Sequence, residues 1–382
     1  MLHPIDKNLA NNVNLLGFNE KKVRKYPYIF IKILLVTAAL TISCGHACAQ
    51  FIHGFDSDIR ALRDNVAGNF STEYDDVLQL SPAALAYALK AFGCESRSGW
   101  DRMAVSHGIS AAAMLSTLSA CNYGIRQETP GGEPHSFPSG HTSMAFMAAT
   151  MLHYEYGWRS PWWSLTGYSL ASATGLLRIL NDSHWASDVI GGAILGICST
   201  HLGYWLGDLI FKDKGLNPEW SRSSWREFRE TSPGLEIGFE RRFIPGRVAA
   251  KDSGELPFRG SGVYVCGTVP LNGWLGLRAK GSAGALMFKD GGSSNLYSLR
   301  AGASATGRLT GPLLWETEAL AGYSSCKKSD GPDFSAAASL NLLCGEYFKL
   351  KMQMGWEAFR YPAAGRRWLN SATAGCSASF SF

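Results

Sequence analysis

Two short stretches of the chain carry residues suited to phosphoryl transfer. The first places Arg178, His184 and Asp188 within eleven residues, with the histidine and the aspartate four apart. Residues four apart share a helix face, so the spacing predicts that the Asp188 carboxylate holds the His184 imidazole. Asp182 or Ser183 is the expected N-cap of that helix. A histidine held in this way is a candidate nucleophile, and an arginine grips phosphate oxygens with two parallel hydrogen bonds.

The second stretch, residues 137–142, reads Phe-Pro-Ser-Gly-His-Thr and leads into an apolar helical pattern. This order places Ser139 and Gly140 at a helix N-terminus, where free N–H groups and the helix dipole favour an anion. His141 is then a candidate general acid that protonates the leaving oxygen. Together the two stretches predict a site for phosphoryl transfer.

These stretches resemble the signature of the type 2 phosphatidic acid phosphatases, which share a fold with vanadium haloperoxidases. The signature reads Lys-x6-Arg-Pro, then Pro-Ser-Gly-His, then Ser-Arg-x5-His-x3-Asp. Residues 138–141 reproduce the second part, and the third is complete except for Leu177 in place of the serine. The resemblance covers roughly residues 75–212. It implies a helical bundle and hydrolysis through a phosphohistidine at His184, without a metal or another cofactor.

The first part of the signature is degraded. Asn122 stands at the position of the family lysine and Thr129 at that of the arginine, and only Pro130 remains. A phosphate carries about −1.5 to −2 charge at neutral pH, and this chain keeps one of the three family cations. Arg126 is one turn beyond Asn122, so on a helix both side chains point the same way. We expect Arg126 to replace part of the lost charge, with His135 as another cation close to the loop.

The start of the chain resembles a secretory signal peptide. A basic cluster at residues 21–25 precedes an apolar run over residues 28–43 and the sequence Ala-Cys-Ala at residues 47–49. This order predicts export and cleavage after residue 49. An uncleaved anchor and a lipoprotein at Cys44 are the alternatives. Removing six basic and two acidic residues leaves 30 and 29, so the near-neutral remainder does not indicate a nucleic-acid partner.

Seven cysteines follow the signal, and none has the spacing of a metal site. Bridges between Cys94 and Cys121, or between Cys326 and Cys344, are possible in an oxidising compartment. Structural thiols are the expected state of all seven.

Helical patterns fill the region up to residue 211. The five predicted helices cover residues 82–92 with Ser81 as N-cap, 102–125, 139–156, 161 or 164 to 180, and 184–211. Residues 189–207 carry no charged side chain if His201 is neutral, which is long enough to span a bilayer or to lie inside a bundle. We expect a bundle that touches the membrane without clearly spanning it. Residues 212–233 form a linker whose tryptophans and arginines suit a membrane surface or a solvated helix.

From Gly234 onwards apolar and polar residues alternate with period 2, which predicts strands with one apolar face. The eight predicted strands cover residues 234–243, 261–269, 273–288, 295–307, 312–324, 333–344, 346–358 and 370–382. An even number of long alternating strands is typical of a small transmembrane barrel. The terminal Phe382 resembles the closing strand of bacterial outer-membrane barrels. Aromatic residues at strand ends favour the membrane, namely Tyr347, Phe359, Tyr361 and Trp368. A soluble barrel or sandwich with apolar residues inward is the alternative.

The sequence thus predicts a multidomain α + β chain. Residues 1–49 are the signal peptide, 50–211 a helical bundle of the type 2 phosphatidic acid phosphatase fold, 212–233 a linker and 234–382 an antiparallel eight-stranded β-barrel. We expect an outer-membrane barrel that tethers a periplasmic phosphatase acting on a phosphorylated lipid or a small phosphomonoester. A soluble periplasmic or inner-membrane-associated protein is the alternative location.

Other functions fit the same motifs. An inactive domain that only binds phosphorylated lipid is favoured by Asn122 and Thr129. A vanadate-loaded haloperoxidase is a further possibility, because one fold hosts unrelated chemistries. The barrel as a structural or assembly component, with the helical domain a relic, is the last.

Overall fold

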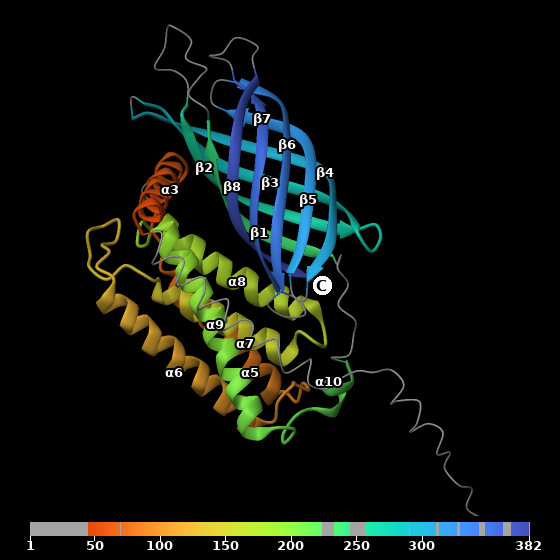
Figure 1. Cartoon of the computed structure of the whole chain (residues 1–382). Coiled ribbons are helices and arrows are strands. Elements are labelled where there is room, and N and C mark those ends of the chain that lie inside the picture. Colours follow the sequence, from red (N-terminus) through yellow and green to blue (C-terminus); the bar gives the residue numbers. More distant parts are fainter. Residues whose placement is uncertain are drawn as a thin grey trace, which may run out of the picture. The chain divides into compact units, whose positions relative to one another are not determined.

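A set of helices precedes a closed barrel of strands in the computed structural model (Figure 1). The structure describes residues 45–68, 70–223, 233–244, 257–289, 291–310, 313–326, 329–343, 348–361 and 368–381. The predicted signal peptide therefore lies almost wholly outside the described residues, as do Cys344, Tyr347 and Phe382.

The helical region contains the five predicted helices and three more. The helices are α3 (Gly45–Val66), α4 (Tyr74–Leu78), α5 (Ser81–Ala91), α6 (Trp100–Gly124), α7 (Gly140–Tyr156), α8 (Pro161–Leu180), α9 (Ala186–Phe211) and α10 (Pro218–Ser223). Ser81 is the first helical residue rather than the N-cap, because Leu80 takes that position. α8 begins at Pro161, whose fixed φ suits the first helical turn. The sequence patterns did not predict α3 or α4.

Helix α7 forms the centre of the bundle, since most of its residues are buried and none is exposed. Close approach of α9 to α7 depends on glycine. A Cβ at Gly196 would lie 2.3 Å from the Ser143 carbonyl oxygen, and one at Gly192 would lie 2.6 Å from that of Ser139. These two positions therefore admit only glycine at this helix spacing. Packing at Gly192 places the start of α9 directly against the start of α7.

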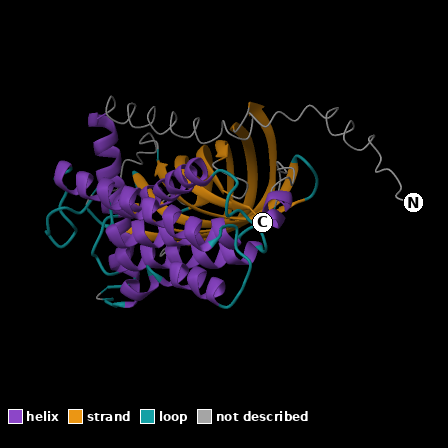
Figure 2. Ribbon diagram, turned by 90° about the horizontal axis from the view of Figure 1, so that it is seen from below, coloured by secondary structure: helices purple, strands orange, loops and turns teal. Residues whose placement is uncertain are grey.

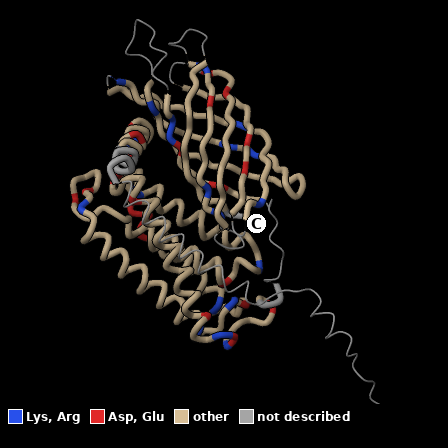
Figure 3. Tube along the Cα trace, viewed as in Figure 1, with Lys and Arg blue, Asp and Glu red and all other residues tan. Residues whose placement is uncertain are grey.

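Charged residues are sparse along the long helices α6, α8 and α9, which appear as extended uncharged stretches in Figure 3. Among the described residues, α6 and α9 are long and apolar enough to cross a membrane, by length and composition alone. In the linker, Trp220 of α10 packs on the guanidinium of Arg97, 4.5 Å from the ring centroid. Trp220 therefore contacts the helical region rather than standing free for a membrane surface.

The barrel strands are β1 (Gly234–Phe243), β2 (Arg259–Pro270), β3 (Leu275–Met287), β4 (Ser293–Thr310), β5 (Leu313–Cys326), β6 (Ser329–Leu343), β7 (Phe348–Arg360) and β8 (Trp368–Ser381). Each strand pairs antiparallel with the next, and β1 pairs with β8 to close the barrel, drawn orange in Figure 2. All eight predicted strands are confirmed, with boundaries within four residues.

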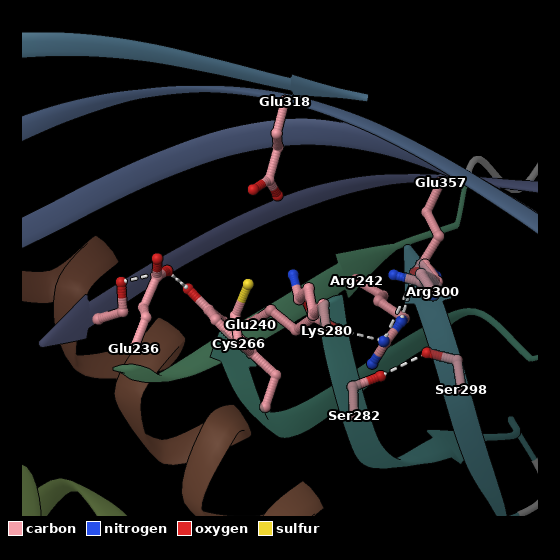
Figure 4. Close-up of polar contacts among 12 residues, drawn as sticks. Glu236, Glu240, Arg242, Cys266, Lys280, Ser282, Ser298, Arg300, Glu318 and Glu357 are labelled. Carbon is pink, nitrogen blue, oxygen red and sulfur yellow. Dashed lines mark hydrogen bonds and ion pairs between the residues drawn. The ribbon is translucent and has the colours of Figure 1, made fainter. Parts of the chain in front are cut away.

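Charged side chains fill the barrel interior, and apolar side chains cover its outside. Arg242 and Arg300 contact Glu357 inside the barrel, all three being fully buried (Figure 4). On the outside, Met352 and Met354 are 73% and 72% exposed. This polarity is the reverse of a soluble barrel, so the alternative with apolar residues inward is wrong.

One prediction about aromatic residues fails. Phe359 and Tyr361 are buried in an apolar cluster with Leu286, Leu296 and Leu369, away from the outer surface. They follow the inward-facing register of Glu357 on β7, which places them inside the barrel. Trp368 is 44% exposed and packs beside Phe334, so it does stand at an outer strand end.

Helix α3 covers a polar patch on the wall formed by β1 and β2. The Asp58 carboxylate accepts a hydrogen bond from Ser261 Oγ at 2.9 Å and lies 3.2 Å from Arg259 Nε. Phe55 of α3 packs edge-on against Phe239, with ring centroids 5.6 Å apart. The helix therefore supplies the countercharge for Arg259 and Arg241 on the outer face of the barrel.

Candidate active site

The Pro-Ser-Gly-His stretch forms the start of α7, as predicted. Ser139 is the fully buried N-cap, and its Oγ accepts hydrogen bonds from the Thr142 N–H at 3.5 Å and the Thr142 hydroxyl at 3.0 Å. Gly140 is the first helical residue, and His141 follows half-buried. The Ser139 N–H donates to the Asp188 carbonyl at 3.0 Å. This bond joins the second and third signature stretches directly.

His184 precedes α9 instead of lying on it, so the prediction of a shared helix face with Asp188 is wrong. Trp185 is the N-cap, in place of the predicted Asp182 or Ser183, and its extended backbone turns the chain before the helix begins. Asp188 is the third helical residue, and it accepts from the Trp185 N–H at 3.0 Å. The Asp188 carboxylate therefore caps its own helix.

The imidazole and the carboxylate nevertheless come close. His184 Nδ1 lies 3.6 Å from Asp188 Oδ2, an ion-pair separation slightly beyond hydrogen-bond range. His184 is 12% exposed and Asp188 is fully buried. Ser136 Oγ also donates to Asp188 Oδ2, while His184 Nδ1 and Asp188 Oδ1 are buried without a hydrogen-bond partner among the described residues. Catalytic hydrogen bonds of free enzymes are often long and tighten when substrate binds.

Arg178 lies in the last turn of α8 and contacts a residue that no motif identifies. Its Nη1 donates to Asp75 Oδ2 at 2.7 Å, and Asp75 is 1% exposed. The next residue, Asp76, accepts from His141 Nε2 at 2.8 Å. The short helix α4 thus brings Arg178 and His141 to adjacent carboxylates. No spacing in the sequence links Asp75 to Arg178, 103 residues away.

Arg126 does not have the placement on which its predicted role depends. Helix α6 ends at Gly124, and the backbone of Ile125 is extended, so Arg126 is not one helical turn beyond Asn122. Arg126 is exposed. Thr129 Oγ1 accepts from the Glu133 N–H at 2.9 Å, which stabilises the loop. The expectation that helical geometry aligns Arg126 with Asn122 is therefore wrong.

The other residues of the degraded stretch pack on one another. A ring nitrogen of His135 contacts the Asn122 carbonyl oxygen, and the His135 ring lies 5.6 Å from that of Tyr123. The Asn122 side-chain oxygen is buried without a hydrogen-bond partner in the described part of the chain. His135 thus holds the end of α6 in its position.

Helix α3 braces the loop that carries His184. The Asp56 carboxylate accepts from the Ser187 N–H at 2.9 Å and the Ser187 hydroxyl at 2.6 Å. Arg60 forms an ion pair with Asp182 at 2.7 Å and lies over the ring of Trp185. The residues on both sides of His184 are therefore held from α3.

Asp75, Asp76 and His141 also have the donor types of a metal site, with one ligand atom from each within 4.8 Å of the others. Each of the three already has a partner, because Arg178 contacts Asp75 and His141 contacts Asp76. The ion pairs account for the cluster without a cation.

Comparison with known proteins agrees with the motifs. Residues 106–211 match the model of the PAP2 superfamily. The lipid A 1-phosphatase of Porphyromonas gingivalis is 47% identical over 169 residues, which are 44% of this chain and 38% of that protein. The chain thus spans 38% of the length of this curated relative. The resemblance of the helical region to the type 2 phosphatidic acid phosphatases is confirmed.

Solved structures resemble each part of the chain separately. LpxE of Aquifex aeolicus is 21% identical and covers 38% of this chain and 92% of its own, with a TM-score of 0.29. Neisserial surface protein A is 10% identical and covers 39% of this chain and 96% of its own, with a TM-score of 0.31. OprG of Pseudomonas aeruginosa is 9% identical and covers 40% and 98%, with a TM-score of 0.27.

Proposed function

We propose that this chain is a phosphatase of the cell envelope that hydrolyses a lipid phosphate and is anchored by its barrel in the outer membrane. The observation that carries the proposal is the hydrogen bond from the Ser139 N–H to the Asp188 carbonyl. It joins the anion-binding start of α7 to the segment that carries His184. An arginine from α8 and a histidine from α7 contact adjacent carboxylates of α4.

The proposed reaction has two steps. His184 attacks the phosphorus through its Nε2, forming an N–P bond, while the P–O bond to the lipid breaks and His141 gives a proton to the leaving oxygen. Water then attacks the phosphohistidine, with His141 taking its proton, and the N–P bond breaks to release phosphate. Arg178 and the free N–H groups of α7 stabilise the charge on the phosphoryl oxygens. Asp188 holds the His184 ring through Nδ1.

A lipid is favoured as substrate over a small soluble phosphate. The relative from Porphyromonas gingivalis acts on the 1-phosphate of lipid A by its name, and the 47% identity supports a similar substrate here. Helix α6 also presents an apolar outer face that ends near the site, with Leu115 49% and Tyr123 80% exposed. Such a face suits acyl chains or a bilayer surface more than water.

The barrel architecture supports the outer membrane as location. Its apolar exterior and charged interior match the alternation of outer-membrane barrels. β1 begins and β8 ends at the same rim, since Gly234 pairs with Ser381. At this rim the short described turn of residues 271–274 joins β2 to β3, since Pro270 pairs with Gly276. Outer-membrane barrels keep short turns on the periplasmic side, which supports a periplasmic position for the helical domain that precedes Gly234.

Phosphate release by the purified chain tests the function. We expect turnover of lipid A or phosphatidic acid presented in detergent micelles, and slower turnover of p-nitrophenyl phosphate. Release from the soluble compound alone would remove the lipid assignment. Tight binding of phosphorylated lipid without release of phosphate would favour the second candidate, a lipid-binding protein. The loss of the family cations at Asn122 and Thr129 supports this candidate.

The lost cations give a second prediction. Asn122→Lys is expected to raise kcat/KM by roughly 10-fold, since one electrostatic stabiliser contributes about 10²–10³ in other enzymes and this lysine enters an unadapted site. Arg126→Ala is expected to change the rate no more than Gln127→Ala, because Arg126 is exposed beyond the helix end. A larger effect of Arg126→Ala would support the hypothesis that Arg126 replaces part of the charge of the lost lysine. Steady-state kinetics on one lipid substrate measures all three variants.

A substitution on the barrel wall tests the membrane location. Met354 is 72% exposed and lies midway along β7. Met354→Arg is expected to lower the free energy of unfolding in vesicles by about 2–4 kcal/mol, as for arginine at a bilayer midplane. Leu271→Arg, in the turn after β2, is the control and is expected to cost about 0–1 kcal/mol. Equal small effects in a urea titration would place Met354 in water.

A further inference from the structure

Helix α4 is clamped to the end of α8 by one asparagine. Asn181 Oδ1 accepts from the Thr72 N–H at 3.0 Å, and Asn181 Nδ2 donates to the Thr72 carbonyl at 2.7 Å and to Asp75 Oδ1 at 3.3 Å. These bonds fix the entry to α4. They place the two acidic residues of its first turn, Asp75 and Asp76, against the site.

Asp75 holds one edge of the Arg178 guanidinium. Its carboxylate, 2% exposed, takes Nη1 of Arg178 and the amide of Asn181, so each oxygen has a partner. Arg178 Nε is buried without a hydrogen-bond partner among the described residues. A guanidinium offers five donors in a rigid fork. Fixing one nitrogen therefore leaves the remaining edge oriented for phosphate oxygens.

Asp76 contacts the other proposed cation of the site. It accepts from His141 Nε2 at 2.8 Å, with the aspartate side chain 61% and the histidine side chain 31% exposed. A hydrogen bond at one ring nitrogen decides which tautomer a neutral histidine adopts. With the Nε2 proton bound to Asp76, His141 Nδ1 is the nitrogen that exchanges a proton with the leaving oxygen.

We propose that Asp75 and Asp76 are positioning residues of the phosphatase reaction: Asp75 fixes Arg178 for phosphate binding, and Asp76 fixes the ring of His141 for proton transfer. This inference rests on the proposed function. The two effects differ in size, because the Asp75 pair is buried and the Asp76 pair is largely solvated. Exposed ion pairs contribute little, whereas a misplacement of about 1 Å in a catalytic group can cost 10²-fold in rate.

The test compares full-length Asp75→Asn and Asp76→Asn with Asp101→Asn, an exposed acidic residue in the first turn of α6. Asp75→Asn is expected to lower kcat/KM about 10²-fold and to weaken inhibition by inorganic phosphate. Asp76→Asn is expected to lower kcat about 3- to 10-fold, less than the roughly 10²–10⁴-fold that a proton-transfer group itself contributes, because His141 stays in place. It is also expected to alter the pH profile of kcat with KM unchanged. Asp101→Asn should match the wild type.

A double-mutant cycle separates positioning from folding. In an Arg178→Lys background, Asp75→Asn is expected to change the rate less than about 3-fold. Lysine at position 178 has no planar guanidinium for Asp75 to orient. Thermal unfolding monitors the fold of every variant. An undiminished effect of Asp75→Asn in that background overturns the proposal for Asp75. An unchanged pH profile in Asp76→Asn overturns it for Asp76.

Two further outcomes are distinguished by the same proteins. The first is a wild-type activity that EDTA abolishes and Mg²⁺ restores, together with an Asp76→Asn activity that does not respond to metal. This outcome would show that Asp75, Asp76 and His141 bind a cation, and it would overturn the proposal that the two aspartates are positioning residues. A wild type without turnover would end the proposed function alone. In that case the binding of inorganic phosphate, measured by calorimetry, tests the role of Asp75. The proposal for Asp75 requires that Asp75→Asn still weakens this binding several-fold.

Discussion

Replacing His184 with alanine is expected to abolish phosphate release, with a loss of about 10⁴-fold or more, as for removal of nucleophiles in other covalent enzymes. The imidazole is the group that forms the covalent N–P bond in the proposed reaction, and no other described side chain is placed to substitute for it. His184 is only 12% exposed, and Asp188 Oδ2 lies 3.6 Å from its Nδ1. Phosphate release from a lipid substrate measures the loss.

A control is Glu95→Ala, an exposed residue that pairs with Arg159 beside the opposite end of α7 from the site. Its removal is expected to change the rate only a few-fold, as surface substitutions usually do. Rapid acid-free quenching with ³²P-labelled substrate should trap a protein-bound phosphate in the wild type and none in His184→Ala. Turnover that survives in His184→Ala would end the phosphohistidine mechanism, and an unchanged envelope phenotype would favour a structural role for the barrel.

The sequence predicts the parts of the site that depend on local pattern. Pro-Ser-Gly-His before an apolar run places Ser139 as N-cap because capping needs only neighbouring residues. The same reasoning fails for His184. The spacing to Asp188 fits a helix, but Trp185 takes an extended conformation and the helix begins after it. Helix boundaries depend on tertiary contacts, here those of α3 with Ser187, which a spacing rule does not contain.

Contacts between distant segments mark the limit of prediction from sequence. Asp75 and Arg178 are 103 residues apart, and Asp76 and His141 are 65 apart. Neither aspartate belongs to a motif, and α4 is too short to show a period. The barrel is the opposite case. Alternation along each strand is local, so all eight strands appear in the sequence, and only the facing of Phe359 and Tyr361 is missed.

The polar interior of the barrel gives the second large effect. Glu357 accepts from Arg242 Nε at 2.6 Å and also contacts Arg300, while Arg300 Nε donates to Asp333 at 2.8 Å. Figure 4 shows Arg242, Arg300 and Glu357 meeting inside the barrel from different strands. Each of the three is at most 1% exposed as a side chain, so among the described residues this part of the interior is closed to water. The interior therefore acts as a packed core built from ion pairs.

Glu357→Gln is expected to lower the free energy of unfolding of the barrel by about 3–5 kcal/mol, because two buried guanidinium groups lose their shared countercharge. Ser298→Ala is the control. It removes one neutral hydrogen bond to Ser282, 2.7 Å long, and is expected to cost about 1 kcal/mol. Urea unfolding in detergent, followed by the mobility difference between folded and unfolded barrel on gels, measures both.

Adding Arg242→Gln to Glu357→Gln is expected to recover part of the loss, because Glu240 then keeps Lys280 as its partner and Arg300 keeps Asp333. Recovery would show that the cost arises from unpaired charge and not from packing, because the second change makes the side chain smaller and would by itself only weaken the packing. A Glu357→Gln barrel as stable as the Ser298→Ala control would mean that water reaches these arginines, and the interior would then be a solvated channel instead of a closed core.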